Sequence, residues 1–264
     1  MNITTRTATV SIVFTIGILA IWLTDAFHNL QVLIGPSMAH RNSKSLVRSE
    51  RTFINETFFK ELAMKFQTDK VTVHRYDRMY TKYLNKYINS RIKFLEIGIG
   101  CTQPVVGSSA LMWRSFFGPT AEINFIEYDR VCGEVWFRKY GQELNITMHY
   151  GDQADEDFLK NVTRKLKVLD VIVDDGGHSM KQQITSFKTL LPIIRSGGHY
   201  FIEDLLTSYM KDFGGKYLDS STTIEFIKRL VDDMQAISPT KSTNIGDILF
   251  SFEISDEICV FNVK

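Results

Sequence analysis

Two apolar runs that each end in acidic residues constrain the fold of this chain most strongly. The runs at 169–173 and 198–202 have the length of strands and carry one polar residue each, as in parallel strands buried on both faces. The residues that follow are Asp174, Asp175 and His178 after the first run, and Glu203 and Asp204 after the second. Because parallel strands bring their carboxyl ends to one crevice, we expect these five side chains to converge. Such a cluster suits a hard cation with a base beside it.

The rest of the sequence alternates strand patterns with helix patterns. Strands are predicted at 92–97, 122–127, 147–150, 169–173 and 198–202, and helices at 108–117, 155–165, 179–191 and 221–234. This order predicts an α/β fold with a doubly wound, mostly parallel sheet. Two further strand patterns, 247–252 and 257–263, are separated by a four-residue polar turn and predict a C-terminal antiparallel hairpin.

The segment 56–87 precedes this alternating region. Its apolar residues recur at steps of three and four, which predicts two helices that form an N-terminal cap on the sheet. The polar break at 68–74, which contains Lys70, is typical of a turn between two helices.

Length, charge and cysteine content narrow the class of protein. The 264 residues, 44% of them hydrophobic, are enough for one large α/β core, which we predict at 53–264 after a linker at 26–52. The formal net charge of +1 and the absence of a basic run among aromatics disfavour nucleic acid as a partner, and homo-oligomerisation stays open. Three dispersed cysteines, Cys101, Cys132 and Cys259, predict no disulfide framework. We expect them to pack as small apolar groups, with Cys101 near a ligand.

The N-terminal segment 1–25 has the character of a membrane anchor. Residues 7–24 carry no charge, and as a helix they would span roughly 27 Å, close to the thickness of a thin bilayer. This predicts a single-pass membrane protein of the endoplasmic reticulum or Golgi type. The alternative is a cleaved signal peptide, which would make the protein secreted. Acceptor sequons at Asn55, Asn145 and Asn161 would carry glycans in a secretory lumen, whereas the basic residues after the segment favour a cytosolic domain.

Glycines after the first strand indicate a ligand that approaches the backbone. Gly98 and Gly100 follow the strand at 92–97, but Gln103 stands where the dinucleotide fingerprint needs a third glycine. The next strand ends in Glu127, whose carboxylate suits the two hydroxyls of a ribose. The sequence therefore favours a nucleoside without a pyrophosphate.

These motifs together resemble a known enzyme family. The segments that carry the resemblance are Leu95–Gly100, Glu127, Gly151–Gln153, Asp174–His178, Thr68–Lys70 and Phe201–Asp204. They are similar to class I S-adenosylmethionine-dependent methyltransferases, and within that class to the macrocin and mycinamicin sugar O-methyltransferases. The resemblance covers about residues 60–210. It implies a Rossmann-like, seven-stranded sheet, S-adenosylmethionine and Mg²⁺ as cofactors, and methyl transfer to a hydroxyl of a small-molecule or sugar-like acceptor.

The same resemblance implies roles for individual residues. Asp175, Glu203 and Asp204 would be metal ligands and His178 the general base. Cofactor contacts are implied at Glu96, Gly98, Glu127, Asp152 and Gln153, to which we add Gly100, Asp174 and Lys70 from the same motifs. The chain departs from the family pattern at Gly177, where a serine is usual, and at Glu127, where aspartate is commoner.

Two other functions stay open from the sequence. Related sequences are often labelled cephalosporin hydroxylase, an iron oxygenase, although that chemistry usually needs two histidines and a carboxylate, and only His178 is placed to serve. A non-catalytic, anchored binding domain would retain the same fold. Taken singly, an Asp-Asp pair is also typical of a helix cap, and a lone histidine is typical of a protein surface.

Overall fold

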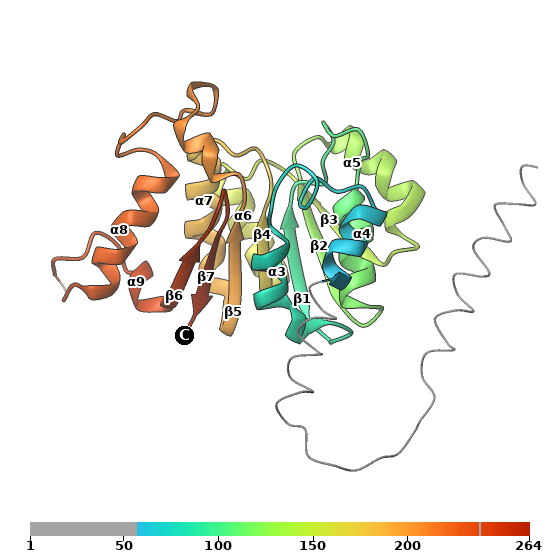
Figure 1. The fold of residues 1–264 in the computed structure, drawn as a ribbon, viewed down its shortest axis with the longest axis horizontal. Coiled ribbons are helices and arrows are strands. Elements are labelled where there is room, and N and C mark those ends of the chain that lie inside the picture. The colour runs from blue at the N-terminus through green and yellow to red at the C-terminus, as the bar shows by residue number, and fades with distance from the viewer. Residues whose placement is uncertain (1–56, 238) are drawn as a thin grey trace, which may run out of the picture. The chain divides into compact units, whose positions relative to one another are not determined.

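The computed structural model describes residues 57–237 and 239–264, and its centre is a seven-stranded sheet (Figure 1). The strands are β1 (Lys93–Ile97), β2 (Glu122–Glu127), β3 (Ile146–Tyr150), β4 (Leu169–Asp174), β5 (Ile194–Ile202), β6 (Leu249–Ile254) and β7 (Cys259–Val263). Their order is β3-β2-β1-β4-β5-β7-β6, with β1 to β5 parallel and β7 antiparallel to both β5 and β6. The predicted mostly parallel sheet with a C-terminal antiparallel hairpin is confirmed.

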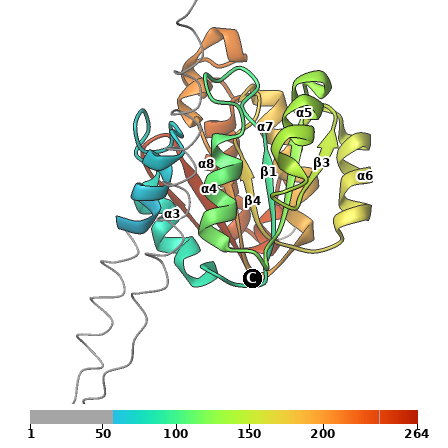
Figure 2. The same ribbon diagram turned by 90° about the vertical axis from the view of Figure 1, so that its right-hand side faces the viewer.

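Helices cover both faces of the sheet (Figure 2). They are α3 (Asp77–Leu84), α4 (Ser108–Phe117), α5 (Arg130–Trp136), α6 (Glu156–Leu166), α7 (Met180–Leu190), α8 (Thr223–Gln235) and the short α9 (Ile245–Ile248); residues 57–65 are also helical. One core contains Phe94 of β1 with apolar residues of 57–65, α3 and α4, and the other contains Leu95 with residues of α6, α7 and α8. Successive strand residues thus enter opposite cores, as the pleat requires.

The register of the sheet brings the predicted site residues to one edge. Ile97 pairs with Asp174, and Asp174 pairs with Ile202, so the residues that follow β1, β4 and β5 emerge side by side. Backbone bonds continue past the strand ends: the Asp175 N–H donates to the Ile97 carbonyl over 3.1 Å, and the Glu203 N–H donates to the Asp174 carbonyl over 3.0 Å. The crossover helix α7 begins at this edge with a capping box formed by Ser179 and Gln182.

The structure contains a helix that the sequence pattern does not predict. Helix α5 and the π-helical turn Phe137–Gly141 lie between β2 and β3. The buried residues of α5 are Gly133 and Trp136, whereas Val131 and Val135 are exposed, so the segment lacks the apolar stripe on which helix prediction depends. Strand β5 also begins at Ile194, four residues before the predicted start, because Arg195 and Ser196 at its exposed beginning conceal the strand pattern.

The prediction that the cysteines form no disulfide was wrong. Cys101, in the loop after β1, is bonded to Cys132 in α5, with 6.1 Å between the two Cα atoms and a sequence separation of 31. The fold brings the loops after β1 and β2 to the same edge of the sheet, which cysteine spacing alone does not reveal. Cys259 is free and buried in β7, as expected of a small apolar group.

The predictions of membrane attachment and of a single-pass membrane location are corrected. Within residues 57–237 and 239–264, every helix is too short or too polar to cross a bilayer. Segment 1–25, on which the predictions depended, lies outside the described residues, as do the linker at 26–52 and the sequon at Asn55.

Candidate active site

Four acids and one lysine meet at the carboxyl ends of β1, β4 and β5. The acids are Glu96, Asp175, Glu203 and Asp204, which we call the carboxylate cluster. Sequence reasoning placed the last three together, and the structure does bring them to one place. Glu96 joins them from inside β1, and its side chain is completely buried.

Lys70 supplies the positive charge inside the carboxylate cluster. Its ammonium donates to Asp175 over 2.6 Å and to both oxygens of Glu203 over 2.8 Å, and it lies 3.4 Å from Glu96. The side chain is completely buried. Burial lowers the pKa of Lys70, but attraction by Asp175 and Glu203 outweighs that effect and holds the pKa well above its usual value. The lysine predicted to contact a cofactor therefore contacts the predicted metal ligands.

The inner acids are enclosed by hydroxyl groups. Tyr80 donates a hydrogen bond to Glu203, and Ser109 donates to Glu96 over 2.7 Å. Burial raises the pKa of Glu203 well above its usual value and that of Glu96 to about 7. Both acids are therefore held in an environment that penalises their negative charge.

The outer acids face histidines. His178 Nε2 lies 3.2 Å from Asp204 and 3.8 Å from Asp175. The donor atoms of these three residues lie within 4.8 Å of one another, and oxygen-rich groups of this kind fit Mg²⁺. Asp204 also accepts a hydrogen bond from the Tyr76 hydroxyl over 2.8 Å.

A second group of donors lies on the other side of Asp204. His74 Nε2 is 3.5 Å from Asp204, and His74 Nδ1 is 2.6 Å from Glu257 in the turn between β6 and β7. The His74 ring stacks on Tyr76 with 4.7 Å between ring centroids. The C-terminal hairpin and the segment before α3 thereby fix the orientation of the Asp204 carboxylate.

The glycine loop after β1 lies directly against the carboxylate cluster. Gly98 has φ +93°, and a Cβ added there would stand 2.2 Å from the carbonyl oxygen of Asp175; Gly100 has φ +75°. Glu127, at the end of β2, accepts from the Ile99 N–H over 2.9 Å and from the Asp129 N–H over 2.7 Å. Each carboxylate oxygen keeps a second lone pair, so Glu127 can still accept from a ligand hydroxyl.

Asp174 and Gln153, two of the other predicted cofactor residues, hold the turn that follows β4. Asp174 is completely buried and accepts from Gln153 over 2.8 Å, from Tyr200 over 3.1 Å and from Ser186. Gln153 in turn accepts from the Gly177 N–H over 2.8 Å. Asp174 therefore stays outside the carboxylate cluster and holds the turn that carries Asp175 and His178. Asp152 is half-buried after β3 and accepts from the Ala154 N–H over 2.8 Å.

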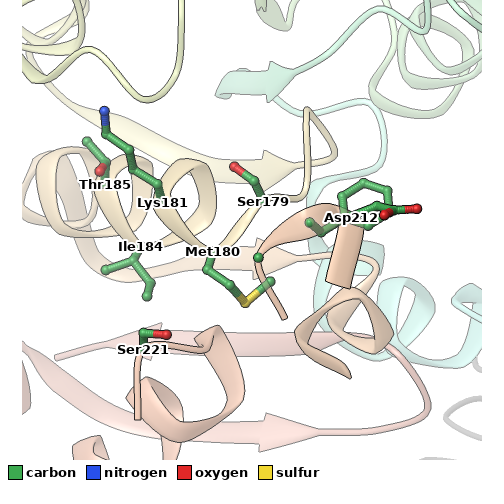
Figure 3. Close-up of a pocket in the computed structure, with 9 residues that line it drawn as sticks. Ser179, Met180, Lys181, Ile184, Thr185, Asp212 and Ser221 are labelled. Carbon is green, nitrogen blue, oxygen red and sulfur yellow. The ribbon is translucent and has the colours of Figure 1, made fainter. Parts of the chain in front are cut away.

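A groove begins one residue after His178 (Figure 3). It is lined by Ser179, Met180, Lys181, Ile184 and Thr185 from the start of α7, by Asp212, Phe213 and Gly214, and by Ser221. Figure 3 shows Met180 reaching from α7 toward the segment that carries Asp212. That segment follows Asp204, and it is tied to the base by a 2.9 Å hydrogen bond from the Thr207 hydroxyl to the His178 carbonyl. The groove offers apolar walls beside the predicted base.

Sequence reasoning missed the residues that complete the site from α3 and α4. Tyr80 and Ser109 fit the apolar or small positions of amphipathic helices, so nothing in the local pattern separates them from core residues. Tyr76 stands just before α3 and was likewise assigned no role. The one available signal was the grouping of Lys70, Tyr76 and Tyr80 within eleven residues, at and just after the polar break between the two predicted helices.

Comparison with known proteins gives consistent relatives. No family model matches the chain. Mycinamicin VI 2''-O-methyltransferase of Micromonospora griseorubida is 34% identical over 181 residues, which are 66% of this chain and 43% of that protein. Demethylmacrocin O-methyltransferase of Streptomyces fradiae is 33% identical over 184 residues, 66% of this chain and 44% of that protein. The chain thus spans less than half of the length of these curated relatives.

A solved structure agrees with the sequence relatives. The methyltransferase MycE from the mycinamycin biosynthetic pathway, in complex with Mg, SAH and mycinamycin VI, matches with a TM-score of 0.68 at 28% sequence identity. The match covers 78% of this chain and 53% of that one.

Proposed function

We propose that this chain is a Mg²⁺-dependent O-methyltransferase. Its sequence and its fold are similar to those of the S-adenosylmethionine-dependent sugar O-methyltransferases. The family resemblance noted in the sequence is confirmed by curated relatives at 30 to 34% identity. Activity, acceptor and site roles are our inference, because the chain matches only part of each relative.

One observation carries the proposal. The glycine loop and Glu127, which suit a nucleoside without a pyrophosphate, lie against an oxygen-rich cluster that includes a histidine. A Cβ at Gly98 would overlap the backbone of Asp175, so the two sites are in direct contact. A methyl donor bound along the loop would therefore be held next to the base and the acceptor, which is the proximity that methyl transfer needs.

The side chains of this site can perform the reaction as follows. Glu127 accepts hydrogen bonds from the ribose hydroxyls of S-adenosylmethionine and fixes that substrate on the loop. His178 takes the proton of the acceptor hydroxyl, and Asp204 and Asp175 stabilise the imidazolium that forms. The acceptor oxygen then bonds to the methyl carbon as the carbon–sulfur bond breaks, and S-adenosylhomocysteine leaves. His178 releases its proton to solvent.

The residues present also fit the implied cation. Asp175 and Asp204, with Glu203 behind them, would hold the Mg²⁺, which as a Lewis acid favours the ionised form of an acceptor hydroxyl.

The acceptor we propose is a glycoside with an apolar aglycone. The relatives' names describe methylation of sugars on mycinamicin and macrocin. In this chain the groove beside His178 has apolar walls at Met180, Ile184 and Phe213 that suit the aglycone. Replacing Ile184 with Trp should raise the acceptor KM about tenfold and leave the S-adenosylmethionine Kd unchanged. An unchanged KM would place the acceptor elsewhere.

The test of the proposed function is calorimetric binding of S-adenosylmethionine, followed by transfer of a labelled methyl group to a panel of glycosides with and without Mg²⁺. Glu127→Ala should abolish binding, whereas Glu122→Ala, at the exposed start of the same strand, should not. His178→Ala should bind the donor and fail to transfer. Absence of donor binding in the unaltered chain would reject the proposal.

The iron-oxygenase alternative is less consistent with the site. In residues 57–237 and 239–264, each group of three donors within 4.8 Å contains one histidine, because His74 and His178 approach different oxygens of Asp204. A two-histidine, one-carboxylate centre needs both rings in one group.

A further inference from the structure

We propose that Lys70 is a built-in counter-ion that competes with the divalent cation for Asp175 and Glu203 and thereby sets the affinity of the site for that cation. The inference rests on the proposed function, which supplies the divalent cation. It goes beyond that function because it assigns a role to Lys70 in setting the affinity for the cation.

The first argument is the position of the ammonium group. Lys70 Nζ makes its closest contact, 2.6 Å, with Asp175, and it contacts both oxygens of Glu203. These are two of the three acids predicted to bind metal. With both its oxygens engaged by the ammonium, Glu203 has little freedom to turn toward a second cation. The groups of donors within 4.8 Å in the described residues accordingly include Asp175, His178 and Asp204 but not Glu203.

The second argument is the balance of charge. Glu96, Asp175 and Glu203 surround one ammonium, and Glu96 and Glu203 are almost fully buried. Burial of unpaired charge is costly, so the ammonium is the group that allows these acids to coexist without metal. A divalent cation bound to the same acids would carry twice the positive charge of the Lys70 ammonium. The two cations repel one another, and each therefore weakens the binding of the other.

The third argument is the attachment of Lys70 to the glycine-loop side of the site. Its ammonium also lies 3.4 Å from Glu96, in the strand that leads into the loop of Gly98. Displaced from Asp175 and Glu203, the ammonium still has Glu96 as a partner, with Ser109 holding the other oxygen of that acid over 2.7 Å. The lysine can thus yield to metal without losing every counter-charge.

The experiment compares Mn²⁺ binding to the full chain and to Lys70→Met, by electron paramagnetic resonance of free Mn²⁺ and without S-adenosylmethionine or acceptor. Met keeps the length and the apolar stem of the lysine and removes the ammonium. We expect Mn²⁺ to bind Lys70→Met about tenfold more tightly or better. We also expect the thermal midpoint of this variant to be lower than that of the unaltered chain without metal, and to rise more steeply with Mn²⁺.

Two further variants make the result specific. Lys82→Met removes an exposed lysine of α3 that pairs with Glu253, and it should leave Mn²⁺ affinity unchanged. The double variant Lys70→Met with Glu203→Gln removes one charge of each sign. It should regain stability without metal and bind Mn²⁺ more weakly than Lys70→Met, even if the single variant is too unstable for titration without metal.

Unchanged or weaker Mn²⁺ binding by Lys70→Met would overturn the inference, since Lys70 would then organise the ligands instead of competing for the cation. Failure of the proposed function is separate. If the unaltered chain binds no S-adenosylmethionine but Lys70→Met binds Mn²⁺ more tightly, the counter-ion inference is supported and the methyltransferase proposal is rejected.

Discussion

Gly98 has both a conformation and a neighbour that only glycine accepts. Its φ is +93°, and an added Cβ would overlap the Asp175 carbonyl oxygen. We predict that Gly98→Ala loses more stability than the ~1–2 kcal/mol of a left-handed residue alone and weakens S-adenosylmethionine binding at least tenfold. Gly197→Ala is the matched control, because Gly197 has φ +76° and nothing within 4 Å of an added Cβ. Urea denaturation and calorimetry measure both, and equal losses would contradict the steric argument.

His199 makes stability depend on pH away from the site. Burial, with repulsion by Lys86, lowers its pKa to about 4. The unfolded chain therefore binds more protons than the folded one between pH 4 and about 6.5, so stability falls as pH falls through this window. The loss approaches about 3.5 kcal/mol over these ~2.5 pH units, at ~1.4 kcal/mol for each unit.

We predict that His199→Phe removes most of this acid loss and costs about 1 kcal/mol at pH 7, because the 2.8 Å hydrogen bond between His199 Nδ1 and Asn262 is lost. The ring lies among Tyr83, Tyr87 and Phe201, and its Nε2 is buried without a hydrogen-bond partner in the structure. Denaturation at pH 5 and pH 7 measures the difference. A slope like that of the unaltered chain would assign the acid loss to other groups.

For individual residues, the sequence predicted which side chains belong to the site better than it predicted which of them contact one another. Asp175 and Asp204 were placed together because strand ends converge, and that rule depends only on topology. Contacts between Lys70 and Glu203, 133 residues apart, depend on how the turn at 68–74 packs on the sheet. A single sequence carries no signal for that packing, since a buried lysine in a polar turn looks like an exposed turn residue and a buried tyrosine on a helix looks like a core residue.

Among the elements, the disulfide joins the loop after β1 to α5 and so links both sides of the predicted nucleoside site. We predict that the double variant Cys101→Ser with Cys132→Ser loses up to about 3 to 4 kcal/mol of stability, the chain-entropy value for a loop of this length, and binds S-adenosylmethionine more weakly. A reducing agent should have the same effect on the unaltered chain and none on the variant. Equal donor affinity in both oxidation states would limit the disulfide to stability.

Elements with a strong apolar stripe or a buried run were predicted closely. Helix α4 and strand β2 have the predicted bounds, 108–117 and 122–127. Helix α5 was missed because capping by Asp129 and the disulfide, not an apolar face, hold it. Elements that depend on a cap or a covalent link are the ones that periodicity does not detect.

For the whole molecule, ligands should act on the complete unfolding transition, because the site is built from three neighbouring strands and the C-terminal hairpin. We predict that S-adenosylmethionine and Mg²⁺ together raise the thermal midpoint more than either alone. A ligand at a hundred times its Kd adds about 2.7 kcal/mol to the free energy of unfolding. A chelator should reverse the Mg²⁺ part. Scanning calorimetry should show one unfolding peak that shifts as a whole. If two peaks appear and ligands shift only one of them, the chain does not unfold as a single cooperative unit.

The order of the last two strands has a consequence for synthesis of the chain. Strand β6 is made before β7, yet β7 lies between β5 and β6 in the sheet. While the chain emerges from the ribosome, β6 therefore lacks its native partner, and β5 keeps an open edge until β7 inserts. Glu257, which orients His74, lies in the turn between these strands. The site can therefore take its final geometry only after both strands have been synthesised, and the nascent chain passes through a stage with an unpaired strand that a chaperone could bind.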